Sequence, residues 1–179
     1  MISKVRGRWS VVAGGLLLVL AGTAGCGSGS RNYALPAEIC GRAVEPPALK
    51  PLLPEGEKFD AEQRSTEEIS SDCAVSVDGR SVFWLVEYRD QGSFDVVEHA
   101  KEIKSARNPV KSDLVEGAIV SDGNFLLMRP CPARGQKSNY ILDISMAGPS
   151  SDTEELRRAL EEFAASYLPE GLRAMGCTE

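Results

Sequence analysis

The side chains that could do chemistry are few and widely spaced. His99 is the only histidine, so a histidine-rich metal site is excluded. A Ser–His–Asp triad would need a nucleophile motif such as GxSxG, which the chain lacks. Three acidic pairs stand out: Glu67-Glu68, Glu154-Glu155 and Glu161-Glu162. The first could bind calcium but lacks EF-hand spacing, and the helical pairs could support hydrolysis but more often form a solvated face. We therefore predict no catalytic residue, no metal ligand and no cofactor.

A small basic island surrounds Cys131 and consists of Arg129, Arg134 and Lys137. It could hold an anion, although a few exposed basic residues near a loop need no such role. The whole chain is acidic, with 26 Asp and Glu against 20 Lys and Arg. Nonspecific nucleic-acid binding needs a basic surface, so we expect no nucleic-acid partner.

Residues 1–25 have the pattern of a secretory signal peptide. They contain no acid, carry Lys4, Arg6 and Arg8 near the start and continue with an apolar run over 11–20 and small residues up to Gly25. The apolar run is shorter than the roughly 20 residues that cross a bilayer. Ala24-Gly25-Cys26 resembles the lipobox of bacterial lipoproteins, although Thr23 stands where leucine is commonest. The resemblance implies cleavage before Cys26 and lipid on its sulfur and amine. The alternative is cleavage near Ala24, which would leave a soluble secreted protein.

The number of cysteines agrees with a lipid on Cys26. Five is an odd number, and lipidation leaves four that can pair in an oxidising compartment: Cys40, Cys73, Cys131 and Cys177. Four cysteines allow three pairings. We favour Cys40–Cys73 and Cys131–Cys177, because each would pin a weakly structured segment to the sheet. No CxxC motif favours a redox pair or a metal site.

The lipid, and not surface charge, must provide the membrane contact. Without the three basic residues of 1–25 the chain has 17 basic and 26 acidic residues, a net charge near −9. Such a chain is not attracted to an anionic membrane. Residues 26–34 form a flexible tether with a reach of roughly 15–20 Å, and residues 35–179 are expected to form one domain.

The domain has the pattern of an α+β fold with the element order ββαβββα. Strands are expected at residues 73–77, 81–88, 115–120, 124–129 and 139–146. Helices are expected at 93–106, with Ser93 as N-cap, and at 152–168, where Pro169 would end or kink the helix. Asp78-Gly79 and Asp122-Gly123 are hairpin signals. These elements predict a mostly antiparallel sheet of about five strands with both long helices on one face.

The N-terminal part of the domain is rich in proline and weakly patterned. We expect a short helix at 36–42, a helical or turn segment at 47–54, and an ordered loop at 55–71 with a short strand near 58–63.

The chain is similar to small secreted lipoproteins of actinobacteria. The similarity rests on Thr23-Ala24-Gly25-Cys26, Ile39-Cys40-Gly41, Leu52-Leu53-Pro54-Glu55-Gly56 and the single cysteines at 73, 131 and 177. It implies an envelope protein with a PsbP/Mog1-like fold and no definite activity.

The expected function is a non-catalytic binding or interaction module, lipid-anchored at the extracytoplasmic face of the cell membrane. Its partners would be the membrane and an envelope protein or small ligand. One alternative is an envelope hydrolase with a site of Glu or Asp residues, which predicts a deep cleft with converging carboxylates. The other is a passive structural lipoprotein, which predicts neither a pocket nor an apolar patch.

Overall fold

The computed structural model describes residues 30–102, 106–134, 138–148 and 153–178. The predicted signal peptide, Cys26, Lys137 and the first part of the tether lie outside these residues. None of the described helices is both long and apolar enough to cross a membrane.

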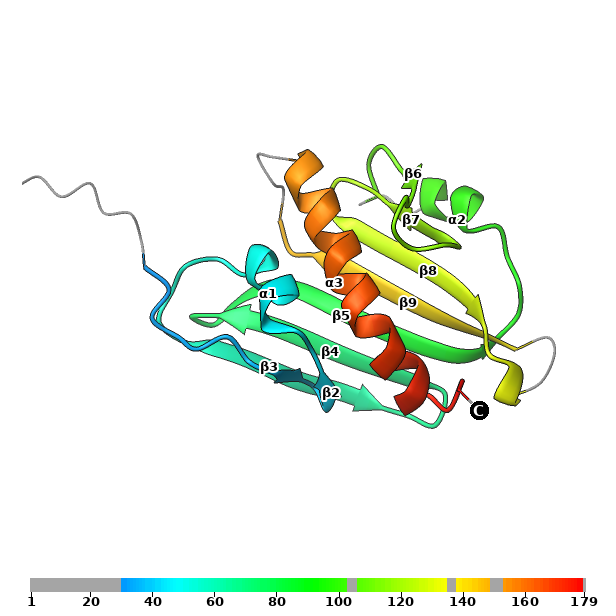
Figure 1. The fold of residues 1–179 in the computed structure, drawn as a ribbon, viewed down its shortest axis with the longest axis horizontal. Helices are drawn as coiled ribbons and strands as arrows, with labels where there is room; N and C mark the ends of the chain where they lie inside the picture. The colour runs from blue at the N-terminus through cyan, green and yellow to red at the C-terminus, as the bar shows by residue number, and fades with distance from the viewer. Residues whose placement is uncertain (1–29, 103–105, 135–137, 149–152, 179) are drawn as a thin grey trace, which may run out of the picture.

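One seven-stranded antiparallel sheet forms the body of the described domain (Figure 1), in the order β3-β4-β5-β9-β8-β7-β6. Its strands are β3 (Phe59–Thr66), β4 (Ser70–Val77), β5 (Arg80–Gln91), β6 (Val110–Lys111), β7 (Ala118–Val120), β8 (Asn124–Pro130) and β9 (Asn139–Met146). The hairpins β3–β4–β5 and β6–β7–β8–β9 meet where β5 pairs with β9. The α+β class and the antiparallel sheet are confirmed, but the predicted number of five strands is wrong.

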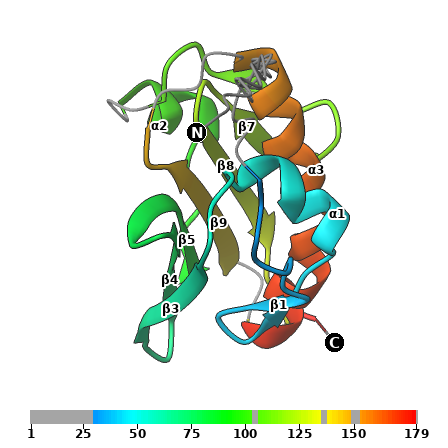
Figure 2. The same ribbon diagram turned by 90° about the vertical axis from the view of Figure 1, so that its left-hand side faces the viewer.

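The helices lie on both faces of the sheet. They are α1 (Pro46–Leu49), followed by the 3-10 turn η1 (Lys50–Leu52), α2 (Val96–Glu102), the 3-10 turn η2 (Pro132–Arg134) and α3 (Thr153–Ala174). Figure 2 shows α1 and α3 on one side of the sheet and α2 on the other. The prediction that both long helices share a face is therefore wrong. The second face at β7 and β8 carries Ile119 and Leu126, which α2 helps to bury.

The core lies between the sheet and α3. Alternation places Phe83 and Leu85 of β5 on the same face as Leu142 and Ile144 of β9, and all four are buried. The predicted apolar stripe of α3 packs against them: Leu156, Leu160, Phe163, Ala164 and Tyr167 are buried. The helix continues past Pro169 to Ala174, and Gly171 in this last part of α3 is buried.

Several predicted boundaries change for identifiable reasons. Residues 36–42 form no helix but the small hairpin β1 (Glu38–Ile39) and β2 (Arg42–Ala43), whose turn places Cys40 and Gly41 at positive φ. Asp95, and not Ser93, caps α2 by accepting hydrogen bonds from the Val97 and Glu98 amides. The third predicted strand begins only at Ala118, after Gly117 at φ 77°.

The first predicted hairpin turn has its expected geometry. Asp78 and Gly79 have φ angles of 52° and 72°, as a type I′ turn requires. In the second turn only Gly123 has positive φ, so that connection is not type I′.

Two disulfides join the elements in the pairing that the sequence favours. Cys40 is bonded to Cys73 and Cys131 to Cys177, with Cα–Cα distances of 5.9 and 4.5 Å. The first fixes the β1–β2 hairpin to β4. The second fixes the segment after α3 to the end of β8.

The N-terminal half of α3 is fixed by a separate ion pair. Arg157 donates to Asp122 in the β7–β8 turn and to the carbonyl of Asn108. The side-chain amide of Asn108 donates to the same carboxylate at 2.7 Å. This hydrogen bond and the nearby guanidinium lower the pKa of Asp122 below its usual value of 3.8.

Loss of the Cys131–Cys177 disulfide should destabilise the domain substantially. The bond closes a sequence separation of 46 residues, for which the chain-entropy model gives about 4 kcal/mol. Cys131→Ala/Cys177→Ala should lower the free energy of unfolding by about this amount in urea titrations. Reduced wild-type protein serves as a second measurement, and an unchanged midpoint in both samples would contradict the prediction.

Asp122→Asn should destabilise the protein at neutral pH but not in acid. A carboxyl whose pKa is lowered by folding stabilises the protein above its unfolded pKa, and this contribution disappears as the pH falls. The difference in unfolding free energy from wild type should therefore be present at pH 6 and shrink below about pH 4. Asp60→Asn, which changes an exposed carboxylate on β3, is the control. A difference independent of pH would contradict this account.

Candidate functional site

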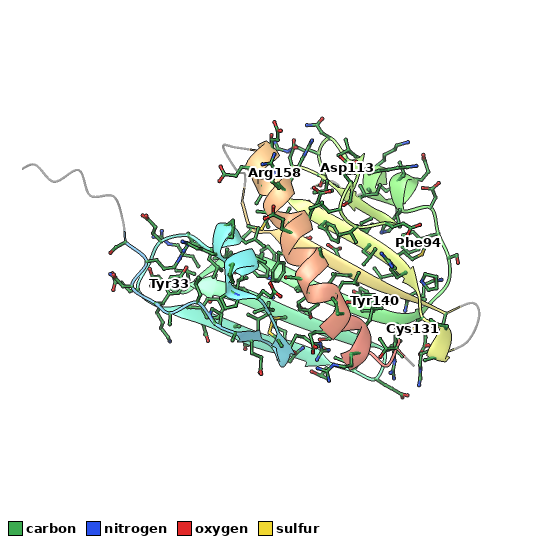
Figure 3. The ribbon with its side chains drawn as sticks, viewed as in Figure 1. Tyr33, Phe94, Asp113, Cys131, Tyr140 and Arg158 are labelled. Atoms are coloured by element: carbon green, nitrogen blue, oxygen red, sulfur yellow. A yellow bond between two sulfur atoms is a disulfide. The ribbon has the colours of Figure 1, made fainter. Side chains whose placement is uncertain are left out.

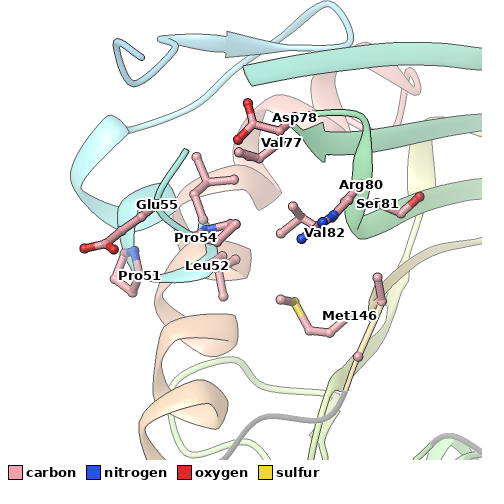
Figure 4. A pocket seen from close by; sticks show the side chains of 13 residues that line it. Pro51, Leu52, Pro54, Glu55, Val77, Asp78, Arg80, Ser81, Val82 and Met146 are labelled. Carbon is pink, nitrogen blue, oxygen red and sulfur yellow. The ribbon is translucent and has the colours of Figure 1, made fainter. Parts of the chain in front are cut away.

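A groove lies between the η1 segment and the tip of the β4–β5 hairpin (Figure 4). Its volume is about 630 Å³. We call it the proline groove and define it by its lining residues: Pro51, Leu52, Leu53, Pro54, Glu55, Val77, Asp78, Arg80, Ser81, Val82, Met146, Ala147 and Gly148. Ligand pockets in proteins typically have volumes of about 300–1,000 Å³, so the groove is large enough for a small ligand.

The local sequence explains one wall of the groove. Pro46 and Pro47 form the first turn of α1 and Pro51 lies in the first turn of η1, where a missing amide proton costs no helical hydrogen bond. Leu52 and Leu53 are buried against the core, while Pro51 and Pro54 remain exposed. The wall is thus a short rigid segment with its apolar rings toward the solvent.

The chain after this wall packs tightly on the β4–β5 turn. The Asp78 carboxylate accepts hydrogen bonds from the amides of Glu57 and Lys58, at 3.1 and 2.8 Å. A Cβ at Gly56 would lie 2.5 Å from Val77 Cγ1 and 2.6 Å from Asp78 Oδ2. Glycine at position 56 is therefore needed for this close approach.

The floor of the groove is apolar, and its rim is charged. Val82 and Met146 are half-buried, and their side chains lie in the hollow (Figure 4). Arg80 and Glu55 are exposed at the rim, and within the described part of the chain neither has an ion pair or a side-chain hydrogen bond. The groove thus combines an apolar floor with charges of both signs at its mouth.

The first described residues run along the back of the same wall. Arg31 donates hydrogen bonds to the carbonyls of Lys50 and Leu53, and the Tyr33 hydroxyl donates to that of Pro54. The backbone amide of Asn32 donates to the Gly56 carbonyl at 2.8 Å. The chain therefore enters the domain beside the groove, at the end where Figure 3 labels Tyr33.

A second candidate is a buried carboxylate that sequence reasoning missed. Glu87 is fully buried on the α3 face of β5. Arg42 pairs with it at 3.0 Å, and the Tyr140 hydroxyl donates to its Oε1 at 2.9 Å. The Tyr167 hydroxyl of α3 is near enough to this carboxylate to lower its pKa. One signal was available in the sequence, since Glu87 follows Phe83 and Leu85 at the spacing of a strand face.

Burial controls the titration of this cluster. It raises the pKa of Glu87, although Arg42 and the two tyrosine hydroxyls act in the opposite direction. It also raises the pKa of Tyr140 and of Tyr167. Glu87 lines none of the four pockets described for the domain. We interpret the cluster as structural, because its polar atoms are directed at one another.

The chemically capable residues named from the sequence do not come together. His99 is exposed on α2 with its ring 4.9 Å from that of Phe94. Glu68 lies 3.6 Å from Arg89, and Arg134 of the basic island lies 3.6 Å from Asp90. Glu161 accepts a hydrogen bond from the Asp113 amide, which joins α3 to the loop after β6.

Two described carboxylates have a pKa that burial raises. Besides Glu87, burial raises the pKa of Asp143 on the α2 face, where Ser145 donates to it at 3.0 Å. Neither carboxylate lines a described pocket. Among the described residues, no group of three His, Cys, Asp or Glu side chains is arranged to hold a metal ion.

Comparison with family models, with curated proteins and with solved structures finds no match to this chain.

Gly171→Ala should destabilise the domain, against the usual preference for alanine in helices. A Cβ at this position of α3 would collide with the Tyr140 hydroxyl and lie 2.8 Å from Glu87 Oε1. Overpacking of this kind costs about 1–3 kcal/mol, whereas Gly→Ala at an open helix position stabilises by about 1 kcal/mol. Chemical denaturation gives the sign. Gly92→Ala, with no atom near the added Cβ, should be close to neutral, and a stabilised Gly171→Ala would show that the cluster is loosely packed.

Proposed function

We propose that this protein is a lipid-anchored binding module of the extracytoplasmic face of the membrane, and that the proline groove is its ligand site. The observation that carries the proposal is the place of the groove beside the point where the chain enters the domain. A ligand in the groove would be held near the membrane to which Cys26 is attached.

The compartment is supported by the cysteines. Two disulfides are present in the domain, and disulfides persist mainly in oxidising compartments outside the cytoplasm. The signal-like residues 1–25 and the lipobox-like Ala24-Gly25-Cys26 support export and anchoring. The similarity to secreted actinobacterial lipoproteins favours the same location.

The groove favours binding over a passive role. A passive lipoprotein would need no hollow of about 630 Å³ with exposed charged side chains at its rim. The segment that forms the wall is also fixed by several hydrogen bonds, from Arg31, Asn32 and Tyr33. A wall fixed before a ligand arrives reduces the entropy cost of binding.

The anchor can be tested directly in the native host. Wild-type protein should be found in the membrane fraction, with a mature N-terminus at Cys26 that carries acyl chains in mass spectrometry. Cys26→Ser should remove the acyl mass and abolish stable membrane retention, because a single lipidated residue supplies the anchor. Ser28→Ala, two residues away, is the matched control.

The same samples show which result would contradict the proposal. An unmodified amine at the mature N-terminus, or Cys40, Cys73, Cys131 and Cys177 recovered as free thiols, would remove the anchor or the compartment.

A further inference from the structure

The short tether limits how far the proline groove can lie from the membrane. Cys26 precedes Ser30, the first described residue, by four links, and four residues span at most about 14 Å when extended. The next residue, Arg31, is hydrogen-bonded to Leu53 in the groove wall. An anchor at Cys26 therefore keeps the groove close to the lipid head groups.

The groove lies at the end of the domain where the chain enters. In Figure 1 the chain enters beside α1 and the tip of the β4–β5 hairpin. The η1 segment that follows α1 and this hairpin tip form the two walls of the groove. The groove and the point where the described chain enters the domain thus lie at the same end of the sheet.

The floor of the groove fits a hydrocarbon chain. Val82 and Met146 line the hollow and are only half-buried, and Pro51 and Pro54 add apolar rings at its edge. Transfer of methylene groups from water to such a surface is favourable. The lining also contains polar side chains, among them Arg80 and Ser81, so the apolar part of the groove consists of Val82, Met146 and the proline rings.

The rim fits a head group with charges of both signs. Arg80 offers a guanidinium with no ion-pair partner among the described residues, and such a group binds phosphate through paired hydrogen bonds. Glu55 and Asp78 place two carboxylates at the same mouth. A purely anionic head group would meet more negative than positive charge there, on a domain whose net charge is near −9. An ammonium group beside the phosphate removes this repulsion.

We infer that the proline groove takes up one acyl chain of a zwitterionic phospholipid from the anchoring membrane, with the phosphate at Arg80 and the ammonium group at Glu55 and Asp78. The inference rests on the proposed function, because the anchor brings the lipid within reach.

Photo-crosslinking in vesicles tests this occupant. The mature, lipidated protein is reconstituted into phosphatidylcholine vesicles with a small fraction of a phospholipid that carries a diazirine on its acyl chain. One set of vesicles holds the ethanolamine form of the probe and the other the anionic glycerol form. Cross-linked peptides are mapped by mass spectrometry. The expected sites are the peptides that contain Val82 and Met146, with a higher yield from the ethanolamine form.

A charge reversal on the exposed rim provides the critical variant. Arg80→Glu should lower groove cross-linking about tenfold, the effect expected from the loss of a charge-assisted phosphate contact. Arg64→Glu makes the same charge change at an exposed position of β3 outside the groove and should alter the yield less than about twofold. Val82→Asp places a charge on the floor of the groove and tests whether an apolar floor is needed. Thermal unfolding of each variant reports whether it is folded.

The outcomes separate the two proposals. If Cys26 is acylated but no cross-link maps to the groove, the inference is wrong and the proposed anchoring stands. This holds whether the groove is empty or holds the protein's own acyl chain. Equal yields from the two probes, or an Arg80→Glu variant that is folded and cross-links like wild type, also overturn it. If Cys26 carries no lipid, the proposed function fails and the inference fails with it.

Discussion

A buried carboxylate needs partners, and Glu87 obtains them from three separate parts of the chain. Arg42 comes from β2, Tyr140 from β9 and Tyr167 from α3. Each partner offsets part of the cost of burying this charge, and a buried charge left without any partner costs several kcal/mol. The cluster therefore joins the N-terminal hairpin, the centre of the sheet and the last helix to one another. Gly171 is the residue that lets α3 approach closely enough.

The two disulfides act on either side of this cluster. Cys40 is two residues from Arg42, and its bond to Cys73 holds the hairpin against β4. Cys177 follows the end of α3 and is bonded to Cys131 after β8. Because the hairpin leads directly into α1 and η1, the same constraint positions one wall of the proline groove. Stability of the core and the shape of the groove are thus linked through covalent bonds as well as packing.

The sequence predicts those elements whose residues alternate in burial, and it fails where the pattern is weak. Strand β9 has its predicted bounds, because apolar residues recur at every second position and Leu142 and Ile144 alternate with the partly exposed Asp143 and Ser145. Strand β3 was expected mainly as a loop, since an edge strand such as Asp60-Ala61-Glu62 carries charges where a central strand carries apolar residues. The groove could not be predicted, because it joins segments that are about 30 and 65 residues apart in the chain. Glu87 and Arg42, 45 residues apart, were missed for the same reason.

The chain enters the described domain at one end of the sheet, and the last described residues, next to Cys177, lie at the other (Figure 1). If the entry end faces the bilayer, the opposite end with η2 and the Cys131–Cys177 bond is the part most accessible to molecules arriving from outside. A reporter or affinity label fused to the C-terminus would then project away from the lipid and leave the groove unobstructed.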